Sequence, residues 1–414
     1  MMEPQGGTNM HQSRIISIKP HRKLLSNVEL PPSKSHLIRW LLLAAQTDGT
    51  VCLNGTRGAS EDAITMLQAI RELGVIIDTQ EDSWIVHGVG PHGFQKPVNP
   101  IQANNSGTAL RLLGVAVTRI GEPVILDGDQ SLRKRFWRPF WDSLDVVSKF
   151  NNDSLPVVIK GPIKDRDIAL DVTRSSQYLS SILLSMPSLD RSLNLSIEGD
   201  LVSQRHASLS FDLAALCGSN NRLEDTTLRP WICQAPGSIQ IPVDASHIAF
   251  WKLYENLHNC ALRIPPVNAI DALGAEILFD LDFKIWQKLS LRDANDLITP
   301  LAASMAIGGG GEIIDVAHAR HKETNRIEKT VEMLSYFSIQ AVETEDGLII
   351  EGGQIPEKPS TLVPTFGDHR MQMTAVVIGS KVGADIEGDK LHRVSFPEFL
   401  DFFTHGAQNG HPTD

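Results

Sequence analysis

Apolar positions along this chain switch between two spacings, one typical of amphipathic helices and one typical of short strands. Residues 69–78 end a helical pattern, turn sharply and continue as an apolar strand. Residues 271–278 and 333–341 show the same pattern. In the first and third copies a short polar turn leads to a second strand, at residues 84–88 and 348–352. The pattern predicts repeated helix, strand, turn and strand units.

Looser copies of this unit lie near Phe150 and near Cys217, and the last helix is expected to end near His405. The units thus recur about every 55 to 75 residues, which is too long and irregular for a solenoid. We expect six units in the 414 residues, arranged as an α/β protein of two pseudo-symmetric halves. The boundary is predicted near residues 237–244, and the strand at residues 15–18 is assigned to the second half.

Four separate segments pair a small-residue loop with a cation where a helix is expected to begin. They are residues 31–35 with Lys34, residues 105–108 with Arg111, residues 320–323 with Arg326, and residues 367–370 with Arg370. The first turn of a helix has unpaired N–H groups and a partial positive charge, so it binds phosphate and carboxylate groups. A nearby arginine or lysine adds the full countercharge. The repetition indicates a polyanionic substrate, and one shared site requires several helix N-termini to face a common cleft.

Composition narrows the class of protein. The length predicts two or three domains, and the formal net charge of −11 argues against a general nucleic-acid binder. No apolar run reaches the roughly 18 to 20 residues of a membrane span, and residues 1–12 lack the features of a signal peptide. The four cysteines are scattered without a C-x-x-C spacing, so no metal site is predicted. We expect a cytoplasmic monomer that binds small molecules, and neither nucleic acid nor a membrane.

Taken one at a time, these motifs also have purely structural explanations. Lys322, Glu323 and Arg326 fit an exposed helix face with ion pairs three and four residues apart. Ser175 and Ser176 fit an ordinary helix cap, and residues 368–370 fit a structural ion-pair cluster. Their joint occurrence in one chain favours the functional interpretation.

Six motifs, taken together and in order, resemble those of the 5-enolpyruvylshikimate-3-phosphate (EPSP) synthase family. They are residues 32–35 with Arg39, 105–109 with Arg111, 127–129 with 131–135, 175–177, 322–324 with Arg326, and 367–371. The resemblance runs from about Ile15 to Phe402 and covers nearly the whole chain. It implies the enolpyruvyl transferase fold, a two-domain inside-out α/β barrel with six βαβαββ-type units, three per domain.

With this fold we expect a discontinuous lower domain of residues 1–28 plus 243–414 and an upper domain of residues 29–242. The hinge between them is expected near residues 28–32 and 237–244. The resemblance implies that helix N-termini of both domains face the cleft between them, which is the geometry that the four anion loops require.

The reaction implied by the resemblance transfers the enolpyruvyl group of phosphoenolpyruvate to the 5-hydroxyl of shikimate 3-phosphate and releases phosphate. It belongs to the shikimate pathway towards chorismate and needs no metal and no organic cofactor. The chemistry requires a base near the hydroxyl and an acid near the methylene carbon. By their places in the motifs, Asp296 is the expected base and Glu323 handles the methylene proton. Lys34 is expected to contact both substrates, and His369 to assist through a hydrogen bond.

The resemblance also implies which residues bind the two substrates. Shikimate 3-phosphate is expected to contact Lys34, Ser35, Arg39, Ser175, Ser176, Gln177, Ser203, Asp296 and Lys322. Phosphoenolpyruvate is expected to contact Lys34, Gly107, Arg135, Gln177, Arg326 and Arg370. Both substrates carry several negative charges, which suits the cationic loops.

The chain departs from the family pattern at several positions. Val394 stands where the family usually has a lysine that contacts phosphoenolpyruvate. Arg393 is its neighbour on a segment expected to be extended, and adjacent side chains on such a segment point in different directions. His206 replaces a tyrosine on the acceptor side, Asn325 replaces an aspartate, and Asn104 replaces a glycine before the second anion loop.

These departures leave alternatives open. One is a divergent enzyme that acts on another shikimate-type or cyclitol phosphate, with a different acceptor or with elimination of phosphate. Another is a non-catalytic binding protein, which is disfavoured because Asp296, Glu323 and Lys34 are all present. The related UDP-N-acetylglucosamine enolpyruvyl transferase is disfavoured as well, because residues 127–137 lack the cysteine of that enzyme's loop.

Overall fold

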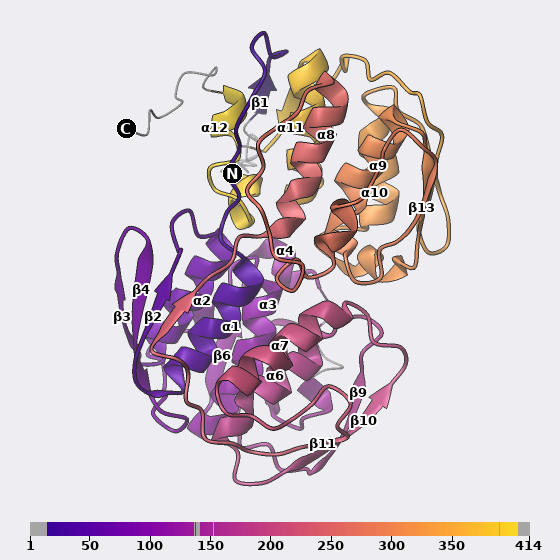
Figure 1. Cartoon of the computed structure of the whole chain (residues 1–414). Helices are drawn as coiled ribbons and strands as arrows, with labels where there is room; N and C mark the ends of the chain where they lie inside the picture. The colour runs from indigo at the N-terminus through magenta and orange to yellow at the C-terminus, as the bar shows by residue number, and fades with distance from the viewer. Residues whose placement is uncertain (1–14, 136, 138–140, 152, 389, 405–414) are drawn as a thin grey trace, which may run out of the picture.

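The computed structural model of the protein has two lobes, each with its own apolar core (Figure 1). It describes residues 15–135, 137, 141–151, 153–388 and 390–404, so the expectations for residues 1–12 and for His405 lie outside the described part. We call the lobes the α1 lobe, whose core spans residues 37–241, and the α11 lobe, whose core joins residues 16–30 to residues 245–403.

The α1 lobe, indigo to rose in Figure 1, packs its helices side by side against three sheets of short strands. Its helices are α1 (Lys34–Ala45), α2 (Glu61–Glu72), α3 (Gly107–Ala116), α4 (Gln130–Arg133), α6 (Gln177–Ser185) and α7 (Gln204–Leu216), with the 3-10 turns η1 (Val117–Ile120) and η2 (Met186–Ser188). Its strands are β2 (Asp48–Asn54), β3 (Ile76–Thr79), β4 (Ser83–Val89), β5 (Ile101–Gln102), β6 (Val124–Asp127), β7 (Val147–Asn151), β8 (Ser154–Ile159), β9 (Asp167–Asp171), β10 (Leu193–Glu198), β11 (Thr227–Leu228) and β12 (Ser238–Gln240). Helix α1 is apolar on nearly every face after its first turn, and it is therefore buried at the centre of this lobe.

The α11 lobe repeats this build around two buried helices. Its helices are α8 (Ile248–His258), α9 (Ile298–Ile307), α10 (Arg326–Ser335), α11 (His369–Val382) and α12 (Asp401–Thr404), with the 3-10 turns η3 (Ala245–His247), η4 (Ala275–Leu278), η5 (Asn295–Leu297), η6 (Ala317–His321) and η7 (Leu391–Val394). Its strands are β1 (Ile15–Ile18), β13 (Gln287–Ser290), β14 (Gly311–Ile314), β15 (Ala341–Glu343), β16 (Leu348–Ile350) and β17 (Ala384–Glu387). Helices α9 and α11 are buried along nearly their whole length. Within the described residues, no helix combines the length and the apolar character of a membrane span.

Three four-stranded sheets share one topology, which confirms two copies of the predicted unit. Their strand orders are β12-β2-β4-β3, β5-β6-β8-β7 and β13-β14-β16-β15. In each sheet the first pair is parallel and the later pairs are antiparallel. As predicted from residues 69–78 and 333–341, α2 leads into the β3–β4 hairpin and α10 into the β15–β16 hairpin. The count of six units stays a prediction.

The prediction of a third helix-to-strand copy at residues 271–278 is wrong. This segment forms turns and η4, and it contains no strand. Ala275 and Leu278 are buried three positions apart, a spacing that places both on one face of a 3-10 turn. Gly274 begins the turn at a φ of 100°, where a Cβ atom would lie 2.7 Å from the Asp293 carbonyl oxygen. The buried pair fits a 3-10 turn and not a strand, whose faces repeat every two residues, and the close approach of Asp293 requires a glycine at position 274.

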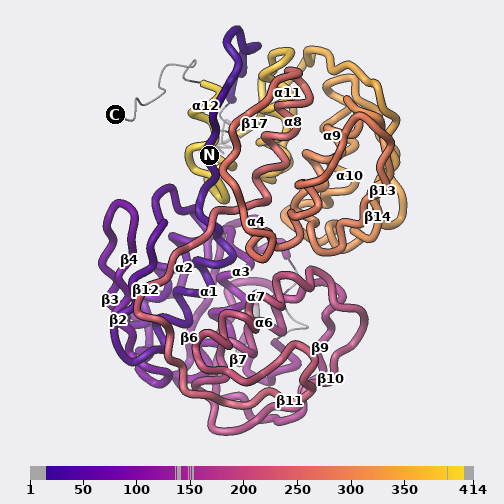
Figure 2. The backbone as a smooth tube through the Cα atoms, viewed as in Figure 1, coloured from indigo at the N-terminus to yellow at the C-terminus, as the bar shows by residue number. Residues whose placement is uncertain are grey.

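Two chain segments connect the lobes next to each other. Figure 2 shows the indigo segment after β1 and the rose segment after β12 running together between the lobes. Pro32 and Val243 form a β-bridge there, and Ser33 N–H donates to the Pro242 carbonyl at 2.8 Å. Strand β1 pairs antiparallel with β17, which confirms that the N-terminal strand belongs with the second half.

Candidate active site between the lobes

The four predicted anion loops all begin helices, and their side chains meet between the lobes. In the α1 lobe, α1 begins at Lys34 and α3 at Gly107; in the α11 lobe, α10 begins at Arg326 and α11 at His369. We call the charged side chains that gather there the charge cluster: Lys34, Arg111, Arg135, Lys322, Arg326, Arg370, Asp62, Asp296, Glu323 and Asp368. Because cations outnumber carboxylates, the cluster favours anionic ligands.

Arg326 is the centre of the cluster and is almost completely buried. Its guanidinium donates from Nε to Asp368 Oδ2 at 2.8 Å, from Nη1 to Asp296 Oδ1 at 2.5 Å, and from Nη2 to Glu323 Oε2 at 2.7 Å. Burial disfavours its charge, but the three carboxylates outweigh burial and raise the pKa of Arg326 well above its usual range. The arginine therefore stays ionised and fixes three carboxylates relative to one another.

Asp296 lies in η5 and keeps 34% of its side chain exposed. Its second oxygen accepts from Arg370 Nη2 at 3.1 Å. Burial works to raise the pKa of Asp296, but Arg370 and Arg326 outweigh it and hold this pKa well below its usual range. Asp296 is thus ionised at neutral pH, which is the state that a general base requires.

Glu323 precedes α10 and faces both lobes. Besides its bond to Arg326, its Oε1 lies 3.8 Å from Arg135 Nη2 of the α1 lobe. Burial works to raise the pKa of Glu323, but Arg326 and Arg135 outweigh it and hold the pKa well below its usual range. An anionic ligand that takes these arginines would release Glu323 from them and so raise its pKa.

Lys34 donates from Nζ to Asp62 Oδ2 at 3.2 Å. Burial works to lower the pKa of Lys34, but Asp62 and Asp296 outweigh it and raise this pKa. Lys34 therefore remains a cation between one carboxylate of its own lobe and one of the other lobe.

Gly107 allows two guanidinium groups to approach the start of α3. A Cβ atom at this position would lie 2.9 Å from Arg135 Nη1 and 3.0 Å from Arg111 Nη1. Arg111 Nη1 donates to Gln177 Oε1 at 2.7 Å, and Gln177 Nε2 donates to Thr108 Oγ1 at 2.8 Å. Among the described residues, the Nε atoms of Arg111 and Arg135 are buried and have no hydrogen-bond partner, so this wall has donors left for a ligand.

The predicted acceptor residues lie at the starts of three helices of the α1 lobe. Ser175 and Ser176 precede α6, and the buried Ser176 Oγ has no hydrogen-bond partner. Ser203 precedes α7, and Ser35 lies in the first turn of α1. Opposite them, burial and the nearby Arg326 lower the pKa of Lys322 to about 8.

Arg39 forms its hydrogen bonds inside its own lobe. It is fully buried and donates to Ser210 Oγ at 2.7 Å, to the Ser35 carbonyl at 2.9 Å and to the His206 carbonyl at 3.1 Å. These bonds tie α1 to α7. A contact between Arg39 and the acceptor stays a prediction.

Two histidines of the site are held neutral. His369 Nε2 and His206 Nδ1 are buried without a hydrogen-bond partner. Burial and Lys34 lower the pKa of His369 well below its usual range, and burial together with Arg39 lowers the pKa of His206 to about 4. His206 and Lys34 line an enclosed cavity of about 30 Å³ between the lobes. Each histidine therefore offers a neutral ring to a ligand in the cleft.

Val394 lies on the rim of the cleft, where the structure is open. A cavity of about 910 Å³ lies between α2 and η7 and is lined by Val394, Lys390, Arg393, Asp62 and Asn105, among others. The prediction of an extended segment here is wrong, because the segment forms the 3-10 turn η7. Arg393 N–H donates to the Lys390 carbonyl, and Ser395 N–H donates to the His392 carbonyl. Arg393 Nε lies 3.3 Å from Glu61 Oε1 of the other lobe.

The other two departures from the family pattern have structural explanations. Asn104 has a φ of 46°, a left-handed conformation that asparagine tolerates, and its Nδ2 donates to Thr65 Oγ1 at 2.9 Å. Asn325 caps α10, with its Oδ1 accepting from Glu328 N–H at 3.4 Å. Both side chains therefore fix the loops on which the site is built.

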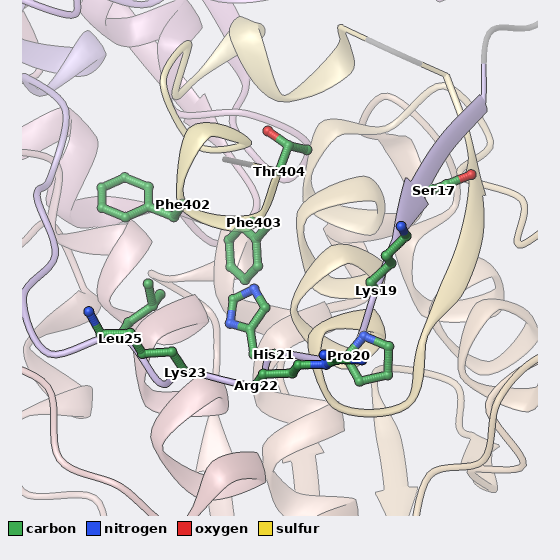
Figure 3. Close-up of a pocket in the computed structure, with 10 residues that line it drawn as sticks. All are labelled: Ser17, Lys19, Pro20, His21, Arg22, Lys23, Leu25, Phe402, Phe403 and Thr404. Atoms are coloured by element: carbon green, nitrogen blue, oxygen red, sulfur yellow. The ribbon is translucent and has the colours of Figure 1, made fainter. Parts of the chain in front are cut away.

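A second large cavity, of about 870 Å³, lies away from the charge cluster on the α11 lobe. Figure 3 shows His21 next to Phe403, with Lys19 on the adjoining strand segment. His21 stacks on Phe403 at 5.4 Å between ring centroids, and its Nδ1 lies 2.8 Å from Tyr254 Oη. No predicted site residue lines this cavity.

Sequence reasoning missed several members of the site. Asp62 follows the capping Ser60 in the first turn of α2, so an acidic first turn was a readable signal for a carboxylate facing Lys34. Asp368 caps α11 by accepting from Arg370 N–H at 2.8 Å, and its motif was noticed without a role for it. Asn295, which donates to Ser203 Oγ, carried no local signal.

No metal-binding group of histidine, cysteine, aspartate and glutamate occurs among the described residues.

The fold is that of the enolpyruvyl transferases. The structure is similar to EPSP synthase from Acinetobacter baumannii (TM-score 0.74, 23% identity, 95% of this chain and 98% of that chain). It is also similar to the enolpyruvyl transferase NikO from Streptomyces tendae (TM-score 0.73, 14% identity, 95% and 98% of the two chains).

The sequence narrows this class to one family. The model of the family described as EPSP synthase (3-phosphoshikimate 1-carboxyvinyltransferase) matches residues 18–251 and 284–403. The chain is 30% identical to the 3-phosphoshikimate 1-carboxyvinyltransferase of Methanothermobacter thermautotrophicus, over 93% of this chain and 96% of that protein. It is 28% identical to the enzyme of the same name from Methanosphaera stadtmanae, over 93% and 98% of the two chains. The chain belongs to the EPSP synthase family.

Proposed function

We propose that the protein transfers the enolpyruvyl group of phosphoenolpyruvate to the 5-hydroxyl of shikimate 3-phosphate and releases phosphate. One observation carries the proposal: Asp296 and Glu323 are both held ionised in one cleft, beside Lys34 and arginines from both lobes. Family membership and the names of the relatives support the same reaction.

The reaction proceeds by addition and elimination. Asp296 accepts the proton of the acceptor hydroxyl, whose oxygen attacks the enol carbon of phosphoenolpyruvate while the methylene carbon gains a proton from Glu323. In the second step Glu323 takes a proton back from the new methyl group as the carbon–oxygen bond to phosphate breaks, and the proton held by Asp296 passes to the leaving phosphate. Glu323 must therefore be protonated when phosphoenolpyruvate is bound. The anionic groups of phosphoenolpyruvate bind Arg326 and Arg135, which then no longer hold the pKa of Glu323 low.

The substrates divide the cleft between them. Phosphoenolpyruvate binds the wall formed by Lys34, Gly107, Arg135, Gln177, Arg326 and Arg370. Shikimate 3-phosphate binds Ser35, Arg39, Ser175, Ser176, Gln177, Ser203, Lys322 and Asp296. The buried donors without a partner on Arg111, Arg135, Arg370 and Ser176 support this division, because a bound anion would satisfy them. His369 assists as a neutral ring.

The two lobes act as hinged domains of residues 29–242 and of residues 1–28 plus 243–414. The paired crossings at Pro32 and Val243 are the hinge, and closure of the lobes excludes water from the cleft. Each domain consists of three βαβαββ-type units, as the three sheets of common topology suggest.

Two residues support a second candidate function. Val394 lines the donor side without a charge, and His206 lines the acceptor side. The fold is shared with NikO, so the fold alone does not select an acceptor. The second candidate is an enzyme that acts on another shikimate-type or cyclitol phosphate.

Phosphate release by the purified protein tests the proposal. We expect release that requires both phosphoenolpyruvate and shikimate 3-phosphate and that is lost in Asp296→Asn, which keeps the shape of the side chain but not its basicity. Folded protein that releases no phosphate with both substrates present would exclude this acceptor and favour the second candidate.

A further inference from the structure

The first turn of α7 is held by the other lobe. Ser203 precedes this helix with a φ of 51°, a left-handed conformation in which its hydroxyl does not cap the helix. Instead, Asp293 Oδ1 of the α11 lobe accepts from Gln204 N–H at 2.5 Å. The Ser203 N–H donates to the Arg292 carbonyl at 3.1 Å. The loop of residues 292–296 thus replaces the missing cap of α7 from across the cleft.

Asn295 makes the buried part of this contact. Its Nδ2 donates to Ser203 Oγ at 3.1 Å, and the two residues are only 5% and 7% exposed. Asn295 Oδ1 is buried without a hydrogen-bond partner. The residue lines the enclosed 30 Å³ cavity together with Lys34 and His206. A buried amide between the lobes next to Asp296 calls for an explanation beyond packing.

We propose that Asn295 is a positioning residue, which sets Asp296 in place by holding its loop against the start of α7. The inference rests on the proposed function, in which Asp296 is the base. Asn295 and Asp296 are adjacent, and one is anchored on Ser203 while the other is anchored on Arg326 and Arg370. Arg326 and Arg370 hold the Asp296 carboxylate from its own lobe, and Asn295 adds an anchor for the loop that exists only while the two lobes touch at Ser203.

This arrangement links closure of the cleft to catalysis. Ser203 is also a predicted acceptor residue, so the acceptor binds where the loop of Asp296 is fastened. An open cleft separates Asn295 from Ser203, so the loop of Asp296 loses this anchor and the base keeps only its bonds to Arg326 and Arg370. A displacement of about 1 Å of a reacting group lowers a rate by on the order of 10²-fold, so the effect of losing this anchor is measurable.

The test compares Asn295→Ala with Arg393→Gln, which breaks an exposed contact between the lobes on the far rim of the cleft. We expect Asn295→Ala to lower kcat by about tenfold or more, with a smaller change in KM for phosphoenolpyruvate. Arg393→Gln is expected to keep kcat within about twofold of wild type. Amide hydrogen exchange gives a readout apart from activity: in Asn295→Ala the peptide 200–206 exchanges faster, and the peptide 391–396 does not.

A double variant separates positioning from general damage. If Asn295 acts through Asp296, Asn295→Ala does not lower further the residual rate of Asp296→Asn, measured in a single turnover at high enzyme concentration. An unchanged kcat in Asn295→Ala, or losses that simply add in the double variant, would overturn the inference. An inactive wild-type protein would instead remove the proposed function, so the two failures are distinguishable.

Discussion

Arg326 and Arg393 belong to the same lobe, face the same cleft and are built into opposite environments. Arg326 is 1% exposed and bonded to three carboxylates, whereas Arg393 is 46% exposed and paired with one. Arg326 at the centre of the cleft is thus buried among several charged partners, whereas Arg393 on its rim is exposed to solvent and held by one partner. Val394, the most serious departure from the family pattern, lies on the rim. We therefore expect a lost cation to be tolerated where solvent and neighbouring side chains can replace it.

The same substitution at both arginines gives the largest expected effect. Arg326→Met leaves three carboxylates without their partner, so we expect a loss of about 3–5 kcal/mol of stability together with loss of activity. Arg393→Met removes an exposed pair and is expected to cost at most about 1 kcal/mol. Thermal unfolding of the two variants measures the difference, and equal losses would break the comparison.

The pH dependence of these variants follows from the carboxylates. The folded-state pKa values of Asp296 and Glu323 are depressed, so their stabilisation is present above about pH 4 and is lost as the pH falls. Burial raises the pKa of Asp368 and opposes this trend in part. The stability gap between wild type and Arg326→Met should therefore narrow below about pH 4. The gap for Arg393→Met should stay small throughout.

Gly107→Ala tests the wall of the cleft that is proposed to bind phosphoenolpyruvate. The added methyl group would lie 2.9 Å from Arg135 Nη1 and 3.0 Å from Arg111 Nη1, and the ends of these side chains have to move. We expect KM for phosphoenolpyruvate to rise about tenfold, which corresponds to about 1.4 kcal/mol. Equilibrium binding of shikimate 3-phosphate serves as the internal control. A rise in both constants would show that the two walls of the cleft are not independent.

Val394→Lys gives the smallest expected effect, because it adds a cation to the open rim. The cavity of about 910 Å³ has room for the side chain, so the fold should be unaffected. We expect KM for phosphoenolpyruvate to fall by about threefold while kcat stays nearly unchanged. Val394→Met, of similar length without the charge, is the matched control. A large gain in kcat would contradict this expectation, because it would show that a cation at position 394 acts on the reaction itself and not only on binding.

Local signals account for what the sequence predicted well. The starts of α1, α3, α10 and α11 follow from small residues and cations within a few positions of each other. The partners of those cations could not be predicted in the same way. Lys34 meets Asp62 at 28 positions' separation and Ser203 meets Asn295 at 92, and no local pattern carries such pairings. The misassigned segment 271–278 shows the same limit, because the close approach of Asp293 to Gly274 joins positions that no local pattern connects.

The pairing of β1 with β17 also sets an order of events during synthesis. Ser17 Oγ donates to Asp385 Oδ1, 368 positions later in the chain. At about 5–20 residues per second, the first strand emerges from the ribosome roughly 20 to 70 s before its partner exists. The α1 lobe, whose core lies between the two, has been synthesised completely by then. A nascent chain of this protein therefore carries one finished lobe and an unpaired strand, which is the period in which it most needs protection from aggregation.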